Sequence, residues 1–249
     1  MPAAQINTNL YSLNAQRNLS KNSIGLATAV ERLSSGLRVN GAKDDAAGLA
    51  IALGMDKSAR GISASIRTAS DIISQAQTAD GALAVVGDIL LRMSELAAQA
   101  SSTTITDTER GYINSEYTAL NTSIATVQGN ATLNSQTAFA NGVSSVAGPG
   151  GSVATSGGAT TAAGAITTSL ASVASNRAVA GSVINNQQFI IQSYETNYEN
   201  QLAAKSRIMD ADFAAETAQL SRYQILQQAG SAMVAQANAI PQNVLTLLR

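Results

Sequence analysis

The sequence contains no histidine, no cysteine and no tryptophan, and only 4% of its 249 residues are aromatic. Without His and Cys there is no zinc site of the usual kind, no thiol nucleophile, no Ser–His pair and no disulfide bond. Catalysis would therefore depend on carboxylate, Lys, Arg, Ser or Tyr side chains. A chain so poor in large aromatic residues is a weak candidate for a compact globule, and extended helices that need a neighbour fit its composition better.

Charged residues are also scarce, at 12% of the chain, and 15 Lys and Arg against 16 Asp and Glu give a net charge of −1. Because there is no basic cluster, we expect no nucleic-acid partner. No apolar run approaches the ~18 residues of a transmembrane helix, so we expect no membrane span. The first residues lack the basic start and apolar centre of a Sec-type signal, which leaves export by another route open.

Apolar residues make up 45% of the chain, and the few charges avoid three stretches. Residues 1–16, 117–176 and 223–248 contain no charged side chain. Within the middle stretch, residues 141–164 are rich in Gly, Ser and Thr. That composition predicts turns and flexible linker, with at most a short hairpin around Asn141-Gly142. The two terminal stretches instead contain periodic apolar residues, which predict helices.

Both ends of the chain carry large apolar residues at spacings of three and four, the pattern of a coiled coil or a bundle helix. At the C-terminal end this pattern has no charged outer face. Pro241 lies inside it and should bend or end that helix. We predict that the two terminal helices pair through residues that include Leu10, Leu13, Leu26, Val30, Leu33, Tyr223, Leu226, Met233, Ile240, Val244 and Leu247.

The residues between the ends predict further helices. Asp44 or Asp45 can cap a helix over 46–100, where apolar residues keep heptad spacing. Thr106 and Glu109 have the spacing of a capping box, which predicts a helix that continues to Gly129-Asn130. Another long helix follows the Gly-rich stretch. The predicted fold class is therefore mainly α, with long antiparallel helices that form a terminal coiled coil and an elongated helical bundle with at most a small β-hairpin.

No motif indicates a catalytic, cofactor-binding or metal site. The close carboxylate pairs, among them Asp44-Asp45 and Asp210 with Asp212, lack the further oxygen ligands and the central Gly of a calcium loop. Helix capping explains them better. The Gly-rich stretch is not followed by the Gly-Lys-Ser/Thr of a phosphate-binding loop. We expect no cofactor and no enzymatic activity.

Three segments resemble bacterial flagellins. Residues 5–9 read Gln-Ile-Asn-Thr-Asn, and residues 31–48 contain Glu-Arg-Leu-Ser-Ser-Gly-Leu-Arg-Val-Asn followed by Ala-Lys-Asp-Asp-Ala-Ala-Gly. Residues 221–230 read Ser-Arg-Tyr-Gln-Ile-Leu-Gln-Gln-Ala-Gly, and similarity continues through residues 235–238 and 241–249. These segments flank the middle of the chain on both sides, and they are long and specific.

The resemblance implies a structural subunit that self-assembles into the flagellar filament used for swimming. Residues 1–44 and 207–249 would form the inner filament core, and residues 45–130 and 169–206 the surrounding rod. Residues 131–168 would be a loop or hairpin in place of the outer domains of larger relatives. The subunit would be exported unfolded by the flagellar type III apparatus and become extracellular. Its implied partners are copies of itself, an export chaperone at the C-terminal segment, the filament cap and the hook-associated junction proteins.

The resemblance also implies a surface recognised by animal Toll-like receptor 5. Arg92, Glu95 and Leu96 match that segment, and Glu116 aligns with a further contact. Leu120 stands where the pattern often has Arg, so we expect weak to moderate activation of the receptor. In a filament, neighbouring subunits would cover the same surface.

Two alternative functions remain open on the sequence. A hook–filament junction protein of the same superfamily would assemble into only a ring or two. A secreted helical effector would insert its charge-poor ends into host membranes, although neutral faces attract membranes less than basic ones. Long filaments would indicate a filament subunit, whereas vesicle leakage without filaments would indicate a membrane-active effector.

Overall fold

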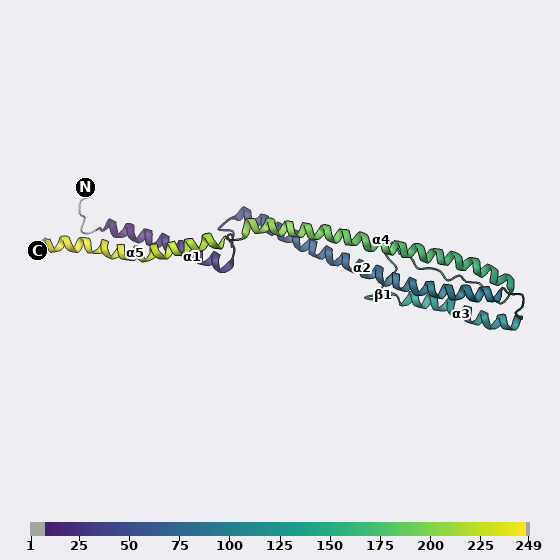
Figure 1. Ribbon diagram of the computed structural model, residues 1–249. Helices are drawn as coiled ribbons and strands as arrows, with labels where there is room; N and C mark the ends of the chain where they lie inside the picture. Colours follow the sequence, from purple (N-terminus) through teal and green to yellow (C-terminus); the bar gives the residue numbers. More distant parts are fainter. Residues whose placement is uncertain (1–7, 248–249) are drawn as a thin grey trace. The chain divides into compact units, whose positions relative to one another are not determined.

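The chain is mainly α-helical, as predicted (Figure 1). The computed structural model describes residues 8–247, with side chains described for residues 8–239. In chain order the elements are α1 (Leu10–Ser35), α2 (Ala46–Ala100), α3 (Asp107–Asn130), β1 (Thr132–Leu133), β2 (Gln136–Thr137), α4 (Ser156–Met209) and α5 (Phe213–Leu247). Among these helices, none combines the length and the apolar character that crossing a membrane requires.

The chain divides into two compact units. The terminal unit comprises Met1–Arg60 and Glu199–Arg249, and the central unit comprises Gly61–Tyr198. The helices α2 and α4 each contribute residues to both units. The predicted boundaries at residues 44/45 and 206/207 concern layers of an assembled filament and stay a prediction.

In the terminal unit, α1 and α5 lie side by side (Figure 1). Asn9 caps α1, because its side chain accepts a hydrogen bond from the Ser12 backbone N–H at 3.1 Å. At the other end Gly36 adopts φ 71° and its N–H donates to the Arg32 carbonyl, a left-handed cap that only Gly forms without strain. The helix α5 continues through Pro241 to Leu247, so of the two alternatives predicted for Pro241, a bend or an end of the helix, the end is excluded.

The core of the central unit consists of residues from α2, α3 and α4 and from the segment between α3 and α4, such as Val143 and Val153. The heptad residues of α2 are buried, and Tyr117 and Ile124 of α3 pack with them. The buried members on α2 are Ala76, Ala79, Leu83, Val86, Leu90, Met93, Ala97 and Ala100. On α4 the buried positions are mostly small, such as Ala159, Ala162 and Ala180, which lets the helices approach closely. The predicted helix over 46–100 and its buried face are confirmed.

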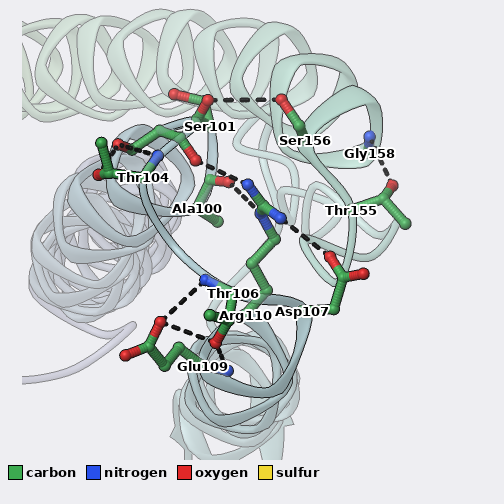
Figure 2. A network of polar contacts seen from close by, with 11 residues as sticks. Ala100, Ser101, Thr104, Thr106, Asp107, Glu109, Arg110, Thr155, Ser156 and Gly158 are labelled. Carbon is green, nitrogen blue, oxygen red and sulfur yellow. Dashed lines mark hydrogen bonds and ion pairs between the residues drawn. The ribbon is translucent and has the colours of Figure 1, made fainter.

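The turn between α2 and α3 is closed by a buried arginine (Figure 2). The Arg110 guanidinium donates from Nε to the Ala100 carbonyl at 2.9 Å and from Nη2 to the Ser102 carbonyl at 2.7 Å. Its Nη1 pairs with the Asp107 carboxylate at 2.9 Å. One side chain therefore satisfies carbonyl groups that the end of α2 leaves without a partner in the helix.

The predicted capping box at the start of α3 is confirmed (Figure 2). The Thr106 backbone N–H donates to the Glu109 carboxylate at 2.8 Å, and the Glu109 backbone N–H donates to the Thr106 hydroxyl at 3.4 Å. The bond from the Thr106 backbone lowers the pKa of Glu109, and the Thr106 hydroxyl adds to that shift. An ionised Glu109 at the N-terminus of α3 also interacts favourably with the helix dipole.

Two predictions for the middle of the chain are wrong. The hairpin pairs Thr132 with Thr137 and Leu133 with Gln136, so it precedes Asn141-Gly142. Its two-residue loop, Asn134-Ser135, has positive φ at both positions, as a tight hairpin requires. The helix α4 begins at Ser156, inside the stretch predicted as linker, because Thr155 caps it by accepting a hydrogen bond from the Gly158 N–H at 3.1 Å.

Candidate functional site

The helices α1 and α5 pair in antiparallel orientation. The Asn9 side chain donates to the Ala237 carbonyl at 2.7 Å near the start of α1. Near the end of α1, Arg32 forms an ion pair with Glu216 at 3.0 Å, and the ring of Phe213 lies near Gly36. The partners' numbers fall along α5 as they rise along α1, which establishes the orientation over the whole described pair.

Small residues occupy much of the surface that each helix presents to the other. Many of the buried and half-buried positions recur at spacings of three, four or seven, which is coiled-coil geometry. They include Ser12, Ala15, Leu19, Asn22, Gly25, Leu26, Ala29 and Leu33 on α1, and Leu220, Tyr223, Gly230, Val234 and Ala237 on α5. The predicted pairing of the terminal helices is thus present within one chain, through a seam that mixes small and large side chains.

The structure places the predicted packing residues in three groups. Leu26, Leu33 and Tyr223 are half-buried between α1 and α5. By contrast, Leu10, Leu13, Val30, Leu226 and Met233 are exposed. The predicted residues Ile240, Val244 and Leu247 lie outside the residues whose side chains the structure describes.

The exposed residues belong to a larger group, which we call the outward apolar set. It comprises large hydrophobic side chains of α1 and α5 that the chain leaves open to water: Leu10, Tyr11, Leu13, Ile24, Val30, Ile225, Leu226 and Met233. Met233 is 62% exposed. Groups of exposed large hydrophobic residues mark interaction surfaces in soluble proteins. Two helices cannot bury such residues without a third partner.

An uncharged polar groove runs beside this set. It has a volume of about 920 Å³ and is lined by Gln16, Leu19, Ser20, Ser23, Gln224, Gln227, Gln228 and Ser231. Amide and hydroxyl groups can hydrogen-bond with a partner or with water without the desolvation cost of a charge. The groove therefore offers no electrostatic obstacle to the approach of another neutral helix.

Backbone and ionic contacts hold the adjoining segments of the terminal unit. The Arg38 backbone N–H donates to the Met209 carbonyl at 2.6 Å, and the Ala211 N–H donates to the Gly36 carbonyl at 2.9 Å. Lys205 Nζ lies 2.5 Å from Asp56 Oδ1. The hydrogen bond from Lys205, followed by the one from Arg60, lowers the pKa of Asp56.

A polar cluster lies on the surface of the central unit. Arg92 of α2 pairs with Glu116 of α3 at 3.0 Å and with Glu95 at 2.9 Å. The hydrogen bonds that Arg92 donates, first to Glu95 and then to Glu116, raise the pKa of Arg92. The structure thus brings together three of the four residues predicted for receptor recognition.

The fourth predicted residue, Leu96, does not belong to this exposed cluster. Its side chain is 2% exposed and packs in the core. It lies on the heptad face of α2, and its side chain is not available to a partner. The neighbouring exposed hydrophobic residue is Leu91.

Two family models account for most of the sequence. Residues 6–144 match the bacterial flagellin N-terminal helical region, and residues 163–248 match the bacterial flagellin C-terminal helical region. The chain is 37% identical to the flagellin of Halalkalibacterium halodurans, over 98% of this chain and 99% of that protein.

The chain belongs to the bacterial flagellin family.

Further flagellins place it among the short members of that family. The flagellin of Bacillus subtilis is 33% identical, over 98% of this chain and all of that protein. The flagellin of Escherichia coli strain E2348/69 is 44% identical over 58% of this chain, but only 25% of that protein is covered. A crystal structure of Bacillus cereus flagellin has a TM-score of 0.47 and 22% identity, covering 51% of this chain and 88% of that one.

Flagellins are structural proteins of the extracellular flagellar filament. This chain is accordingly a filament subunit, and its paired terminal helices are the part that leaves large apolar side chains exposed. Sequence reasoning missed the buried Arg110, although its position one residue after the capping box was visible. It also missed Gly25, beside which the ring of Tyr223 from the opposite helix lies.

Proposed function

We propose that this flagellin builds the filament by burying its outward apolar set between copies of the chain. The observation that carries the proposal is that the α1–α5 pair leaves large hydrophobic side chains of both helices exposed outside its seam. Burying apolar surface contributes roughly 25 cal/mol per Å². Residues such as Ile24, Ile225 and Met233 would therefore favour association as soon as neighbouring pairs come into contact.

The absence of charge from the described part of α5 after Arg222 supports the same proposal. A helix that stays solvated normally carries charged side chains on its outer face, whereas one that is surrounded by others does not. The uncharged groove beside the set adds no buried charge that would need a partner. Association would thus gain apolar burial with little electrostatic cost.

Further partners follow from the family and are part of the proposal. An export chaperone would hold residues 207–249, whose outward residues Ile225 and Met233 need covering before assembly. A cap protein would insert subunits at the distal tip, and hook-associated proteins would join the filament to the hook. Export through the flagellar type III apparatus would make the chain extracellular. We propose no catalytic role, because flagellins are structural proteins and no site motif is present in the sequence.

Seeding the purified chain with filament fragments, followed by electron microscopy, tests the proposal. We expect long thin fibres that grow from the seeds. Growth that stops after a ring or two would support a junction protein instead. Leakage of neutral or anionic lipid vesicles without fibres would support a membrane-active effector. Either of these results contradicts the filament proposal.

We further propose that monomers activate Toll-like receptor 5 through the cluster of Arg92, Glu95 and Glu116. The support is the exposure of these side chains and their arrangement on α2 and α3. In a reporter-cell assay we expect weak to moderate activation by the monomer. Arg92→Ala should weaken activation about fivefold or more, since Arg residues at interface centres commonly contribute over 1 kcal/mol.

Arg177→Ala is the matched control for the receptor assay. Arg177 is also half-exposed in the central unit and forms an ion pair with Asp80 at 2.8 Å, but it is not part of the cluster. Its replacement should leave activation unchanged. No response to the unmodified monomer at high concentration would rule out the receptor proposal.

A further inference from the structure

Two glycines of the terminal helix pair are contacted by large side chains from the opposite helix. A Cβ atom at Gly25 of α1 would lie 2.6 Å from Cζ and 2.7 Å from Cε1 of Tyr223 on α5. A Cβ atom at Gly230 of α5 would lie 3.1 Å from Cδ1 of Leu19 on α1. The arrangement is reciprocal, because each helix supplies one glycine and one large side chain.

The backbone conformation does not require glycine at either position. Both lie inside α-helices, and neither has the positive φ that favours glycine at Gly36. Glycine in a helix interior costs about 1 kcal/mol relative to alanine. Other helical glycines, such as Gly81 and Gly164, face open space. What distinguishes Gly25 and Gly230 is the side chain that occupies the space beside them.

The other specific contacts that determine the register of α1 against α5 lie near the two ends of the pair, where Asn9 donates to the Ala237 carbonyl and Arg32 pairs with Glu216. Between these ends the seam is uncharged, and it includes small residues such as Ser12 and Ala15 that make no specific cross-helix contact by their size. Across the described α1–α5 contact, Arg32–Glu216 is the one ion pair, and it lies at one end. A shift of one heptad would move the helices by about 10 Å. The middle of the pair therefore needs its own register contacts.

We propose that the contacts Tyr223–Gly25 and Leu19–Gly230 are specificity determinants that set the register of α1 against α5. Large side chains fit only where the opposite helix leaves a space, so the two contacts together admit one register. That register determines which residues of the two helices line up side by side in the outward apolar set. The effect of these contacts on assembly rests on the proposed filament function. Their effect on the register within one chain is independent of that function.

The test combines an exchange variant with a distance measurement on the full chain. Because the chain has no Cys, Ser20→Cys and Ser231→Cys introduce two unique spin-label sites beside the pair. Distances are measured by pulsed electron paramagnetic resonance in the single chain and, after dilution with unlabelled chain, in seeded filaments. Gly230→Leu should broaden the distance distribution or shift it by up to about 10 Å, and lower seeded assembly at least tenfold.

The exchange variant Leu19→Gly/Gly230→Leu keeps the composition and moves the large side chain to the other helix. It should restore the single distance and most of the assembly. Gly25→Ala should broaden the distribution because the Tyr223 ring must leave its position. The control Gly81→Ala, where the space is open, should change neither measurement.

Two results would overturn the register proposal. One is an unchanged distance in both Gly25→Ala and Gly230→Leu. The other is an exchange variant whose defect equals the sum of its two single replacements, since contacting residues must be coupled. Failure of the filament proposal is recognised separately, because the unmodified chain would then show one distance but form no fibres.

Discussion

Replacing Met233 with aspartate should abolish filament growth while the single chain keeps its helices. Met233 is 62% exposed in the chain, so the carboxylate stays in water until assembly. In the filament a copy would cover it, and an unpaired buried charge costs about 3–5 kcal/mol. That cost corresponds to a reduction of the association constant by roughly 100- to 5,000-fold for each subunit added. Electron microscopy after seeding measures the loss, and circular dichroism of the unassembled chain checks the fold.

Met233→Leu is the matched control, because it keeps the volume and apolar character of the side chain. It should assemble like the unmodified chain. Ile225→Asp, on the same helix and also exposed, should reproduce the loss. Filaments of normal length from Met233→Asp would show that this side chain stays in water in the polymer.

Arg110→Ala should destabilise the central unit more than any other replacement of a charged residue there. The side chain is the link between the end of α2 and the start of α3, and residue 110 is 8% exposed. Its removal leaves the Ala100 and Ser102 carbonyls without their donors. Hydrogen bonds to charged groups contribute about 1.5–3 kcal/mol each, so we expect the free energy of unfolding to fall by about 2–4 kcal/mol. Urea unfolding of the unassembled chain, followed by circular dichroism, measures it.

Two further variants identify the cause of that loss. Arg110→Lys keeps the charge but cannot donate from three nitrogen atoms, so it should be intermediate. Arg177→Ala removes a half-exposed ion pair in the same unit and should have little effect, because water already screens it. Equal stability of Arg110→Ala and Arg177→Ala would contradict the role given to the buried guanidinium.

Sequence periodicity predicted the helices, the burial of the central unit and, on α5, the inward position of Tyr223, but it placed Leu226 and Met233 inward as well. The predicted pattern on α5 included Leu226 and Met233, whereas the half-buried position that follows Gly230 is Val234. Within the pair, the inward positions include small residues such as Ala29 and Ala237, whereas other large residues such as Met233 face outward. Hydrophobicity alone cannot distinguish a contact within the chain from a contact with a copy.

The errors in the middle of the chain have a similar physical cause. The Gly, Ser, Thr and Ala residues over 141–164 predict a linker, but Ala159 and Ala162 are buried in the structure. Small residues that are flexible in water also allow close helix packing when a partner lies beside them. The hairpin prediction followed the Asn-Gly pair, whereas Asn134-Ser135 provides the turn between the paired strands. Asparagine tolerates the left-handed conformation, so both sites were compatible with a turn.

The receptor prediction shows what sequence matching can and cannot establish. The match at Arg92, Glu95 and Glu116 corresponds to an exposed cluster across two helices. The adjacent match at Leu96 corresponds to a core position. A linear motif on a helix includes residues of every face, and only the packing of α2 against α3 and α4 determines which of them are exposed.

Oxidation of methionine tests most directly whether copies of the chain cover the outward apolar set. Peroxide converts exposed methionine to its sulfoxide, and mass spectrometry measures the extent at each residue. Met93, which is fully buried in the central unit, is the internal standard for protection. We predict that Met233 oxidises rapidly in the single chain and becomes nearly as protected as Met93 once filaments form. Equal oxidation rates of Met233 in the single chain and in the filament would contradict burial between copies.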